Sequence, residues 1–276
     1  MKENKNNISC VILDWAGTTV DFGCFAPLNA FTRVFADHGL PISIEEARGP
    51  MGLAKRDHIR ELLKIERISA LFLKNHGYPW MEDDVERLYA DFVPALMKTL
   101  DAFCRPIEGV VETVEQLRVG EIMIGSSTGY TAKMMEVVAE GAAAAGYSPD
   151  ALVTPDETGL GRPYPYMIFR NMEKLGVYPP RRAVKVGDTA SDIAEGKNAG
   201  VWSVGVITGS SELGLDRLEL ASLSASERLY KFRRTQRNFY SAGADFVINE
   251  ITELPMLIEK INMINAKNAG KEENIQ

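Results

Sequence analysis

The sequence CVILDWAGTTV, residues 10–20, joins a short apolar run to a carboxylate and a turn rich in glycine and threonine. Its first four residues favour a strand, and Asp14 follows them directly. Other apolar runs of similar length occur at 122–126, 183–187, 202–207 and 245–248. Runs of this kind that alternate with helical patterns predict buried parallel strands in a doubly wound, Rossmann-like α/β sheet.

Helical periodicity fills the segments between these runs. The clearest predicted helices cover residues 110–119, 131–145, 165–175, 191–199 and 251–264. The segment between the first two strands has helical patterns, almost no strand signal, and too many residues for a simple crossover. We therefore expect a helical cap domain, residues 25–105, inserted into a core domain made of residues 1–24 and 106–276.

Glycine and proline interrupt the pattern near Gly23 and near Arg105-Pro106, where we expect the hinges of the cap. The polar ends of the chain, MKENKNNIS and NAGKEENIQ, are expected to be a frayed end and a disordered tail.

The composition is that of an ordinary folded protein. The 276 residues are 45% hydrophobic and 25% charged, with a net charge of -7 and no basic segment suited to nucleic acid. No window approaches the roughly 18 apolar residues that a transmembrane helix needs. The polar start lacks the apolar region of a signal peptide, and the three cysteines match no zinc-site spacing. We expect a cytoplasmic protein that binds neither nucleic acid nor a membrane.

Polar side chains follow three of the predicted strands. They belong to the turn after Asp14, to GSSTGY at 125–130, and to VGDTASD at 186–192, where Asp188 and Asp192 are four residues apart. Ligands of parallel sheets bind beyond the carboxyl ends of the strands, so these groups should meet. Carboxylates suit Mg²⁺, and backbone amides and hydroxyls suit phosphoryl oxygens. Each motif alone could be an Asx turn, a common loop or a helix cap, but three in this order are a strong signal.

The three motifs together resemble those of the haloacid dehalogenase superfamily of phosphotransferases. The resemblance implies that Asp14 is a nucleophile that forms an aspartyl-phosphate and that it shares a Mg²⁺ with Asp188. It also implies that Asp192 lies behind the metal ligands and orders a water molecule at the metal. Ser127 or Thr128 would bind a phosphoryl oxygen, and the sequence does not decide between the two hydroxyls.

One position departs from the superfamily pattern. Most of its phosphatases carry a second Asp two residues after the nucleophile, and Ala16 stands there in this sequence. The missing group is the general acid that protonates an alcohol leaving group, so hydrolysis of phosphate esters should be handicapped. The family pattern implies that the backbone carbonyl of Ala16 can still bind the metal.

Five stretches, DWAGTTVDFGCFAP, PMGLAKRDH, STGYT, GRPYP and VGDTASD, resemble the phosphonatase family of this superfamily, in the cap as well as the core. The resemblance implies that Lys55 forms a Schiff base with an aldehyde beside a phosphonate. The imine would act as the electron sink that a carbanion leaving group requires. Arg162 would balance the charge on the phosphonate and on Asp14. Without the resemblance, Lys55 and Arg162 would be interpreted as exposed residues.

Further residues adjoin these motifs. His58 lies three positions after Lys55 on the same helical face, as a proton shuttle or as a packed residue. The candidates for the aldehyde pocket, each with core packing or turn formation as an alternative, are Cys24, Met51, Gly52 and Tyr130.

The expected reaction is hydrolysis of the carbon-phosphorus bond of phosphonoacetaldehyde to acetaldehyde and phosphate, with Mg²⁺ as cofactor. The resemblance also implies a homodimer formed through cap helices. Two alternatives remain open at this point: a phosphate-ester phosphatase or phosphomutase of the same superfamily, and a non-enzymatic binding protein on the same fold.

Overall fold

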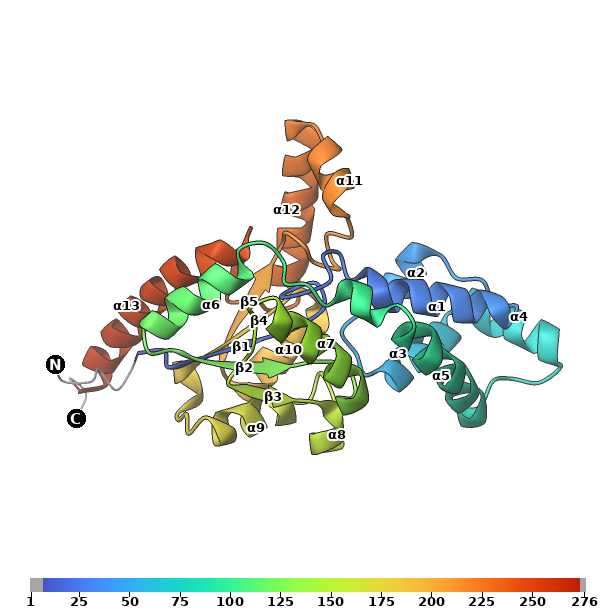
Figure 1. Ribbon diagram of the computed structural model, residues 1–276, viewed down its shortest axis with the longest axis horizontal. Helices are drawn as coiled ribbons and strands as arrows, with labels where there is room; N and C mark the ends of the chain where they lie inside the picture. The colour runs from blue at the N-terminus through green and yellow to red at the C-terminus, as the bar shows by residue number, and fades with distance from the viewer. Residues whose placement is uncertain (1–6, 274–276) are drawn as a thin grey trace.

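The computed structural model describes residues 7–273 and has a six-stranded, fully parallel sheet at its centre (Figure 1). The strand order is β3-β2-β1-β4-β5-β6. The strands are β1 Cys10–Leu13, β2 Met123–Ser127, β3 Ala151–Val153, β4 Ala183–Gly187, β5 Trp202–Val206 and β6 Phe246–Ile248. Every residue of β1 and β4 is buried, as expected for central strands covered on both faces. The predicted doubly wound α/β fold is confirmed.

Helices surround the sheet and fill the connections between its strands. Alternate side chains of β1 belong to two different apolar clusters, because successive residues of a strand point to opposite faces. Val11 and Leu13 pack in the larger cluster, and Cys10 and Ile12 pack in a second cluster with residues of α9. The helices of the core are α6 Val110–Val119, α7 Ala132–Ala144, α8 Pro155–Thr158, α9 Tyr166–Lys174, α10 Ala190–Ala199, α11 Arg217–Ser222, α12 Ala225–Ser241 and α13 Leu254–Glu273.

The helical insert lies between β1 and β2 in the sequence and to one side of the sheet in space (Figure 1). Its helices are α1 Phe25–Asp37, α2 Ile44–Arg48, α3 Lys55–Lys64, α4 Glu66–His76 and α5 Glu82–Met97. The described part of the chain also contains three 3₁₀ helices: Leu100–Phe103, Pro180–Arg182 and Ile251–Glu253. The apolar faces of α1, α3 and α5 are buried against one another, which is why the amphipathic pattern was visible in the sequence.

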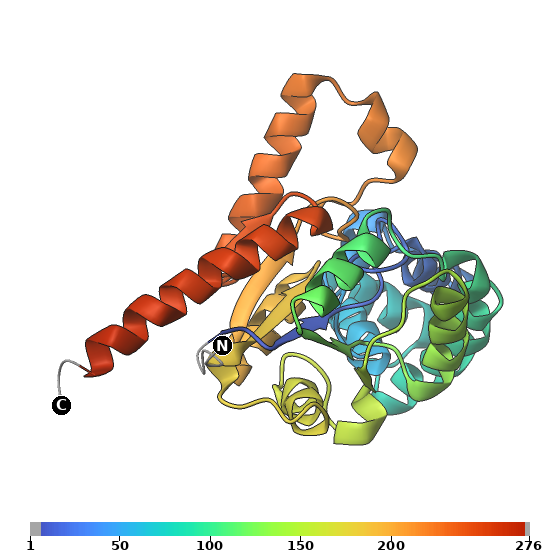
Figure 2. The same ribbon diagram turned by 60° about the vertical axis from the view of Figure 1, so that its left-hand side comes forward.

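Three elements differ from the predictions. The short edge strand β3 was not predicted, because its three residues carry too little pattern. The hairpin of α11 and α12 projects from the body (Figure 2) and buries only Leu220, Thr235 and Phe239, so it has almost no apolar stripe. The last helix extends to Glu273, so the tail predicted from Asn268 is wrong that far. The rest of that tail and residues 1–6 of the predicted frayed end lie outside the described residues.

Within residues 7–273, none of the helices is both long and apolar enough to cross a membrane.

Candidate active site

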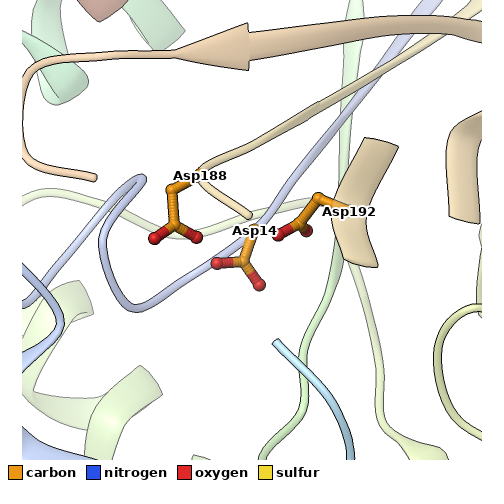
Figure 3. A group of neighbouring side chains, drawn as sticks. All are labelled: Asp14, Asp188 and Asp192. Atoms are coloured by element: carbon orange, nitrogen blue, oxygen red, sulfur yellow. The ribbon is translucent and has the colours of Figure 1, made fainter. Parts of the chain in front are cut away.

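Three buried carboxylates lie together at the carboxyl ends of β1 and β4 (Figure 3). Asp14 follows β1, Asp188 follows β4, and Asp192 lies in the first turn of α10. One oxygen from each lies within 4.8 Å of the others. Gly17 allows this close approach: it has φ of +91°, and a Cβ there would lie 2.2 Å from an Asp188 oxygen. The first and third predicted motifs therefore meet.

The acids carry more negative charge than their surroundings balance. Burial, followed by the charges of Asp14 and Asp192, raises the pKa of Asp188 well above its ordinary value. Burial also raises the pKa of Asp14, although Arg162 opposes the shift. A divalent cation would remove this repulsion, and oxygen ligands are the ones that Mg²⁺ prefers. The residues present thus fit the predicted metal.

Arg162 contacts two of these three acids, Asp14 and Asp192. It is 3% exposed, and each of its three side-chain nitrogens contacts a different carboxylate. The distances are 2.6 Å to Asp14, 2.9 Å to Asp192 and 3.0 Å to Glu195. The interpretation of Arg162 as an exposed turn arginine is wrong. All three nitrogens of its planar guanidinium group contact carboxylates.

The two candidate phosphoryl-binding hydroxyls have different environments. The Ser127 hydroxyl donates a hydrogen bond of 2.9 Å to Glu195 and accepts one of 3.0 Å from Lys185. The Thr128 oxygen accepts a hydrogen bond of 3.1 Å from the backbone N–H of Tyr130. The Ser127 proton is therefore committed to a buried carboxylate, and the geometry favours Thr128 as the donor to a ligand.

A loop of the insert lies directly on the motif loops of the sheet. Gly52 has φ of +90°, and a Cβ there would lie 2.3 Å from the hydroxyl of Thr189, next to Asp188. A Cβ on Gly129, next to Thr128, would lie 2.8 Å from the carbonyl oxygen of Leu53. The backbone at residues 52–53 therefore packs on both of these motif loops, and Lys55 follows two residues later.

Lys55 is the first residue of α3 and is 6% exposed. Its amine lies over the ring of Tyr130, 4.8 Å from the centroid, and 5.8 Å from the centroid of Phe31. Burial lowers the pKa of Lys55, and the positive charge of Arg162 adds to this effect. The interpretation of Lys55 as a surface residue is wrong, and its environment favours the neutral, nucleophilic amine.

His58 is fully buried one turn after Lys55, stacked on Phe31 with ring centroids 3.9 Å apart. Its Nε2 lies 2.9 Å from the carbonyl oxygen of Ala47, so Nε2 carries the proton and donates. Its Nδ1 has no hydrogen-bond partner among the described residues. Burial, with the charge of Lys55, holds the pKa of His58 well below its ordinary value. The ring is therefore a neutral base with one free acceptor.

The remaining predicted residues lie around this centre. Cys24 and Met51 are buried in one small apolar cluster, and Ala16 packs against it. The Tyr130 hydroxyl is buried and has no hydrogen-bond partner in residues 7–273. Cys24 has the left-handed backbone φ of 56° immediately before α1. This arrangement is compatible with both interpretations of Cys24 and Met51, as packed core residues and as residues that line a pocket.

Comparison with known proteins assigns the family. Residues 8–200 match the family described as haloacid dehalogenase-like hydrolase. A phosphonoacetaldehyde hydrolase from Lysinibacillus sphaericus is 52% identical over 256 residues, which cover 92% of this chain and 95% of that protein. The chain belongs to the phosphonoacetaldehyde hydrolase family. A second member, from Bacillus cereus strain G9842, is 48% identical over 92% of this chain and 96% of its own length.

A longer relative and two solved structures are also similar to this chain in sequence or in fold. A bifunctional phosphonoacetaldehyde hydrolase/aminoethylphosphonate transaminase from Clostridioides difficile is 50% identical over 97% of this chain, which spans only 42% of that protein. A phosphonoacetaldehyde hydrolase-like protein from Oleispira antarctica superposes with a TM-score of 0.93 at 35% identity, covering 97% of this chain and 98% of the other. A β-phosphoglucomutase from Clostridium difficile shares the fold alone, with a TM-score of 0.66 at 17% identity over 93% of this chain and 98% of that one.

Two buried charged residues of this phosphonoacetaldehyde hydrolase family member were not predicted. Lys185 lies within β4 and Glu195 within α10, and both are fully buried. Burial alone would raise the pKa of Asp192, but the charges of Arg162 and Lys185 outweigh it and lower that pKa. Two signals were available: a lysine inside the apolar run AVKVG, and a glutamate three residues after Asp192, which places both acids on one helical face.

Proposed function

We propose that this protein hydrolyses phosphonoacetaldehyde to acetaldehyde and phosphate, through a Schiff base on Lys55 and an aspartyl-phosphate on Asp14. The observation that carries the proposal is a buried amine with a lowered pKa, held at the start of α3 directly after an insert loop that packs on the loops beside Asp14. A phosphate ester offers no use for such an amine. The activity named for relatives at about half identity supports the same substrate.

The first step joins Lys55 to the substrate aldehyde. The neutral amine attacks the carbonyl carbon, and the carbinolamine takes up one proton from solvent as it loses water, which leaves a protonated imine. During this step a proton also moves from nitrogen to the departing oxygen. The free Nδ1 of neutral His58, one helical turn away, is suited to take and return that proton. The buried surroundings of Lys55 exclude competing water from the imine.

The second step breaks the carbon-phosphorus bond. A carboxylate oxygen of Asp14 attacks phosphorus, and the electron pair of the bond moves into the imine to give an enamine on Lys55. Arg162 and the Thr128 hydroxyl stabilise the charge on the phosphoryl oxygens. Protonation of the enamine carbon and hydrolysis by water release acetaldehyde and the amine. A second water molecule cleaves the aspartyl-phosphate to phosphate and restores Asp14.

The ligands proposed for Mg²⁺ are the carboxylates of Asp14 and Asp188 and the backbone carbonyl of Ala16, with Asp192 behind them. When bound, the cation would offset negative charge between the nucleophile and the phosphoryl oxygens. Substrate contacts from Ser127, Tyr130, Met51, Gly52 and Cys24 belong to the same proposal.

We extend the proposal to the architecture. Residues 25–105 would act as a cap domain that closes on a core of residues 1–24 and 106–276, and cap helices would form a homodimer. The three free, buried cysteines fit a reducing cytoplasm.

Two measurements test the function. Phosphate release should be fast from phosphonoacetaldehyde and at least about a hundredfold slower from simple phosphate esters, because the acid for an alcohol leaving group is missing. Borohydride added during turnover should reduce the imine and leave a stable adduct on Lys55, located by peptide mass spectrometry.

Matched lysine variants sharpen the second measurement. Lys55→Arg keeps much of the side-chain length but provides no amine nucleophile, so it should give neither adduct nor turnover. Lys64→Arg changes an exposed lysine at the other end of α3 and should behave as wild type. An adduct on Lys133 or Lys185, or substantial turnover by Lys55→Arg, would overturn the proposal.

A further inference from the structure

A buried pair of opposite charges, Lys185 and Glu195, lies beside Arg162 and takes no part in the steps above. Glu195 accepts hydrogen bonds from Arg162 Nε at 3.0 Å and from the Ser127 hydroxyl at 2.9 Å. The Lys185 amine lies 2.9 Å from Asp192 and 3.6 Å from Glu195. Removing two charges from water is costly before they pair, so a role in folding alone is a weak explanation.

Turnover would affect the three carboxylate contacts of Arg162 differently. Asp14 holds one terminal nitrogen at 2.6 Å, but its carboxylate becomes an acyl phosphate when it attacks phosphorus and loses its charge. Asp192 holds the other terminal nitrogen with an oxygen that it shares with Lys185. Glu195 alone of the three is neither the nucleophile nor a member of the three-acid cluster.

We propose that Glu195 is a positioning residue that keeps the Arg162 guanidinium aimed at the phosphoryl group while Asp14 is phosphorylated, and that Lys185 keeps the charge of the site matched to a divalent cation. This proposal rests on the proposed function. The role of Lys185 follows from formal charges. The site has an excess of two negative charges, because four acids face two cations. The acids are Asp14, Asp188, Asp192 and Glu195, and the cations are Arg162 and Lys185. Removing either member of the pair changes that excess by one, in a buried setting where screening is weak.

Two variants separate position from charge. Glu195→Gln keeps an acceptor oxygen but removes one negative charge. The double variant Lys185→Met/Glu195→Met removes both charges with little change in volume, a replacement that buried ion pairs often tolerate, so the net charge is kept and the Arg162 contact is lost. Glu157→Gln, in the partly exposed Lys174–Glu157 pair, is the matched control.

Binding of Mg²⁺ alone is measured by calorimetry, followed by inorganic phosphate at saturating Mg²⁺. Glu195→Gln should raise the Mg²⁺ Kd by about tenfold or more, and the double variant should leave it within about threefold. The double variant should raise the phosphate Kd and lower kcat/KM by at least about tenfold, the loss of one charge-assisted hydrogen bond. Glu157→Gln should leave all three unchanged.

Wild-type Mg²⁺ affinity in Glu195→Gln, or wild-type phosphate affinity in the double variant, would overturn the proposal. If the double variant does not fold, the Mg²⁺ titration of Glu195→Gln decides the charge balance. Its phosphate titration then decides the positioning of Arg162, which a neutral amide holds less strongly than a carboxylate. If the wild type fails to release phosphate from phosphonoacetaldehyde, the proposed function fails, but both titrations still test the roles of Glu195 and Lys185.

Discussion

The carboxyl group of Asp21 gives a stability test that is independent of the reaction. Its two oxygens accept hydrogen bonds of 2.9 Å from the backbone N–H groups of Phe25 and Ala26, in the first turn of α1. Burial raises the pKa of Asp21 to about 7, against the opposing effects of these hydrogen bonds and of the charges on Lys55 and Arg48. The buried carboxylate therefore destabilises the fold when it is ionised.

The sign and size follow from proton linkage. An Asp in an unfolded chain has a pKa of about 3.9, so the folded state holds its proton more tightly. The contribution of Asp21 to stability is then fully present below about pH 4 and is lost as the pH rises to about 7. The difference of about three pKa units corresponds to about 4 kcal/mol, of which about 3 kcal/mol falls between pH 4.5 and pH 8.

Urea unfolding of the wild type and of Asp21→Asn at these two pH values measures the effect. The Asn variant does not titrate and keeps one acceptor oxygen, so the wild type should lose about 3 kcal/mol relative to it on going to pH 8. Asp37→Asn, at an exposed position near the end of the same helix, should change by less than about 1 kcal/mol. A difference between wild type and Asp21→Asn that is constant across the two pH values would refute the reasoning.

Three further predictions concern the site. Lys55→Met should abolish turnover yet bind inorganic phosphate within about threefold of wild type by calorimetry, and residual imine trapping would contradict it. Gly52→Ala should lower kcat/KM at least about tenfold, because the new Cβ would strike Thr189. Gly77→Ala controls for backbone strain, because Gly77 has φ of +82° and open space around it. Equal effects of the two variants on kcat/KM would exclude the loop contact as the cause. Chelation of Mg²⁺ should abolish activity and lower the Tm, both restored by added Mg²⁺, and full activity after verified metal removal would rule out the acidic site.

The sheet could be predicted because its central strands are buried on both faces and so read as continuous apolar runs. The bounds of α6 agree with the prediction, since Gly109 and Gly120 flank it in the sequence. The edge strand β3 and the hairpin of α11 and α12 carry no comparable signal. A strand of three residues has no measurable period, and a helix that buries two residues needs no apolar stripe.

The residues of the site also divide into those that the sequence could predict and those that it could not. Asp14 and Asp188 each follow a strand, and strand ends are visible in a sequence. Arg162 and Lys55 were recognised only through resemblance, because long charged side chains are usually exposed and their burial is decided by tertiary packing. Glu195 and Lys185 were missed for that reason, although a lysine inside the apolar run AVKVG and a glutamate three residues after Asp192 were visible in the sequence.

In the proposed reaction, the alanine at position 16 and the buried Lys55 are related through the leaving group. An alkoxide needs a proton, which an acid two residues after Asp14 could give, whereas a carbanion needs an electron sink. Ala16 packs against the apolar cluster that holds Met51, four residues before Lys55. A carboxylate there would enter apolar surroundings beside the loop that carries the amine, and its negative charge would favour the protonated, unreactive lysine. The methyl group adds no charge to that cluster, and the two features are compatible with cleavage of a carbon-phosphorus bond and poorly compatible with hydrolysis of a phosphate ester.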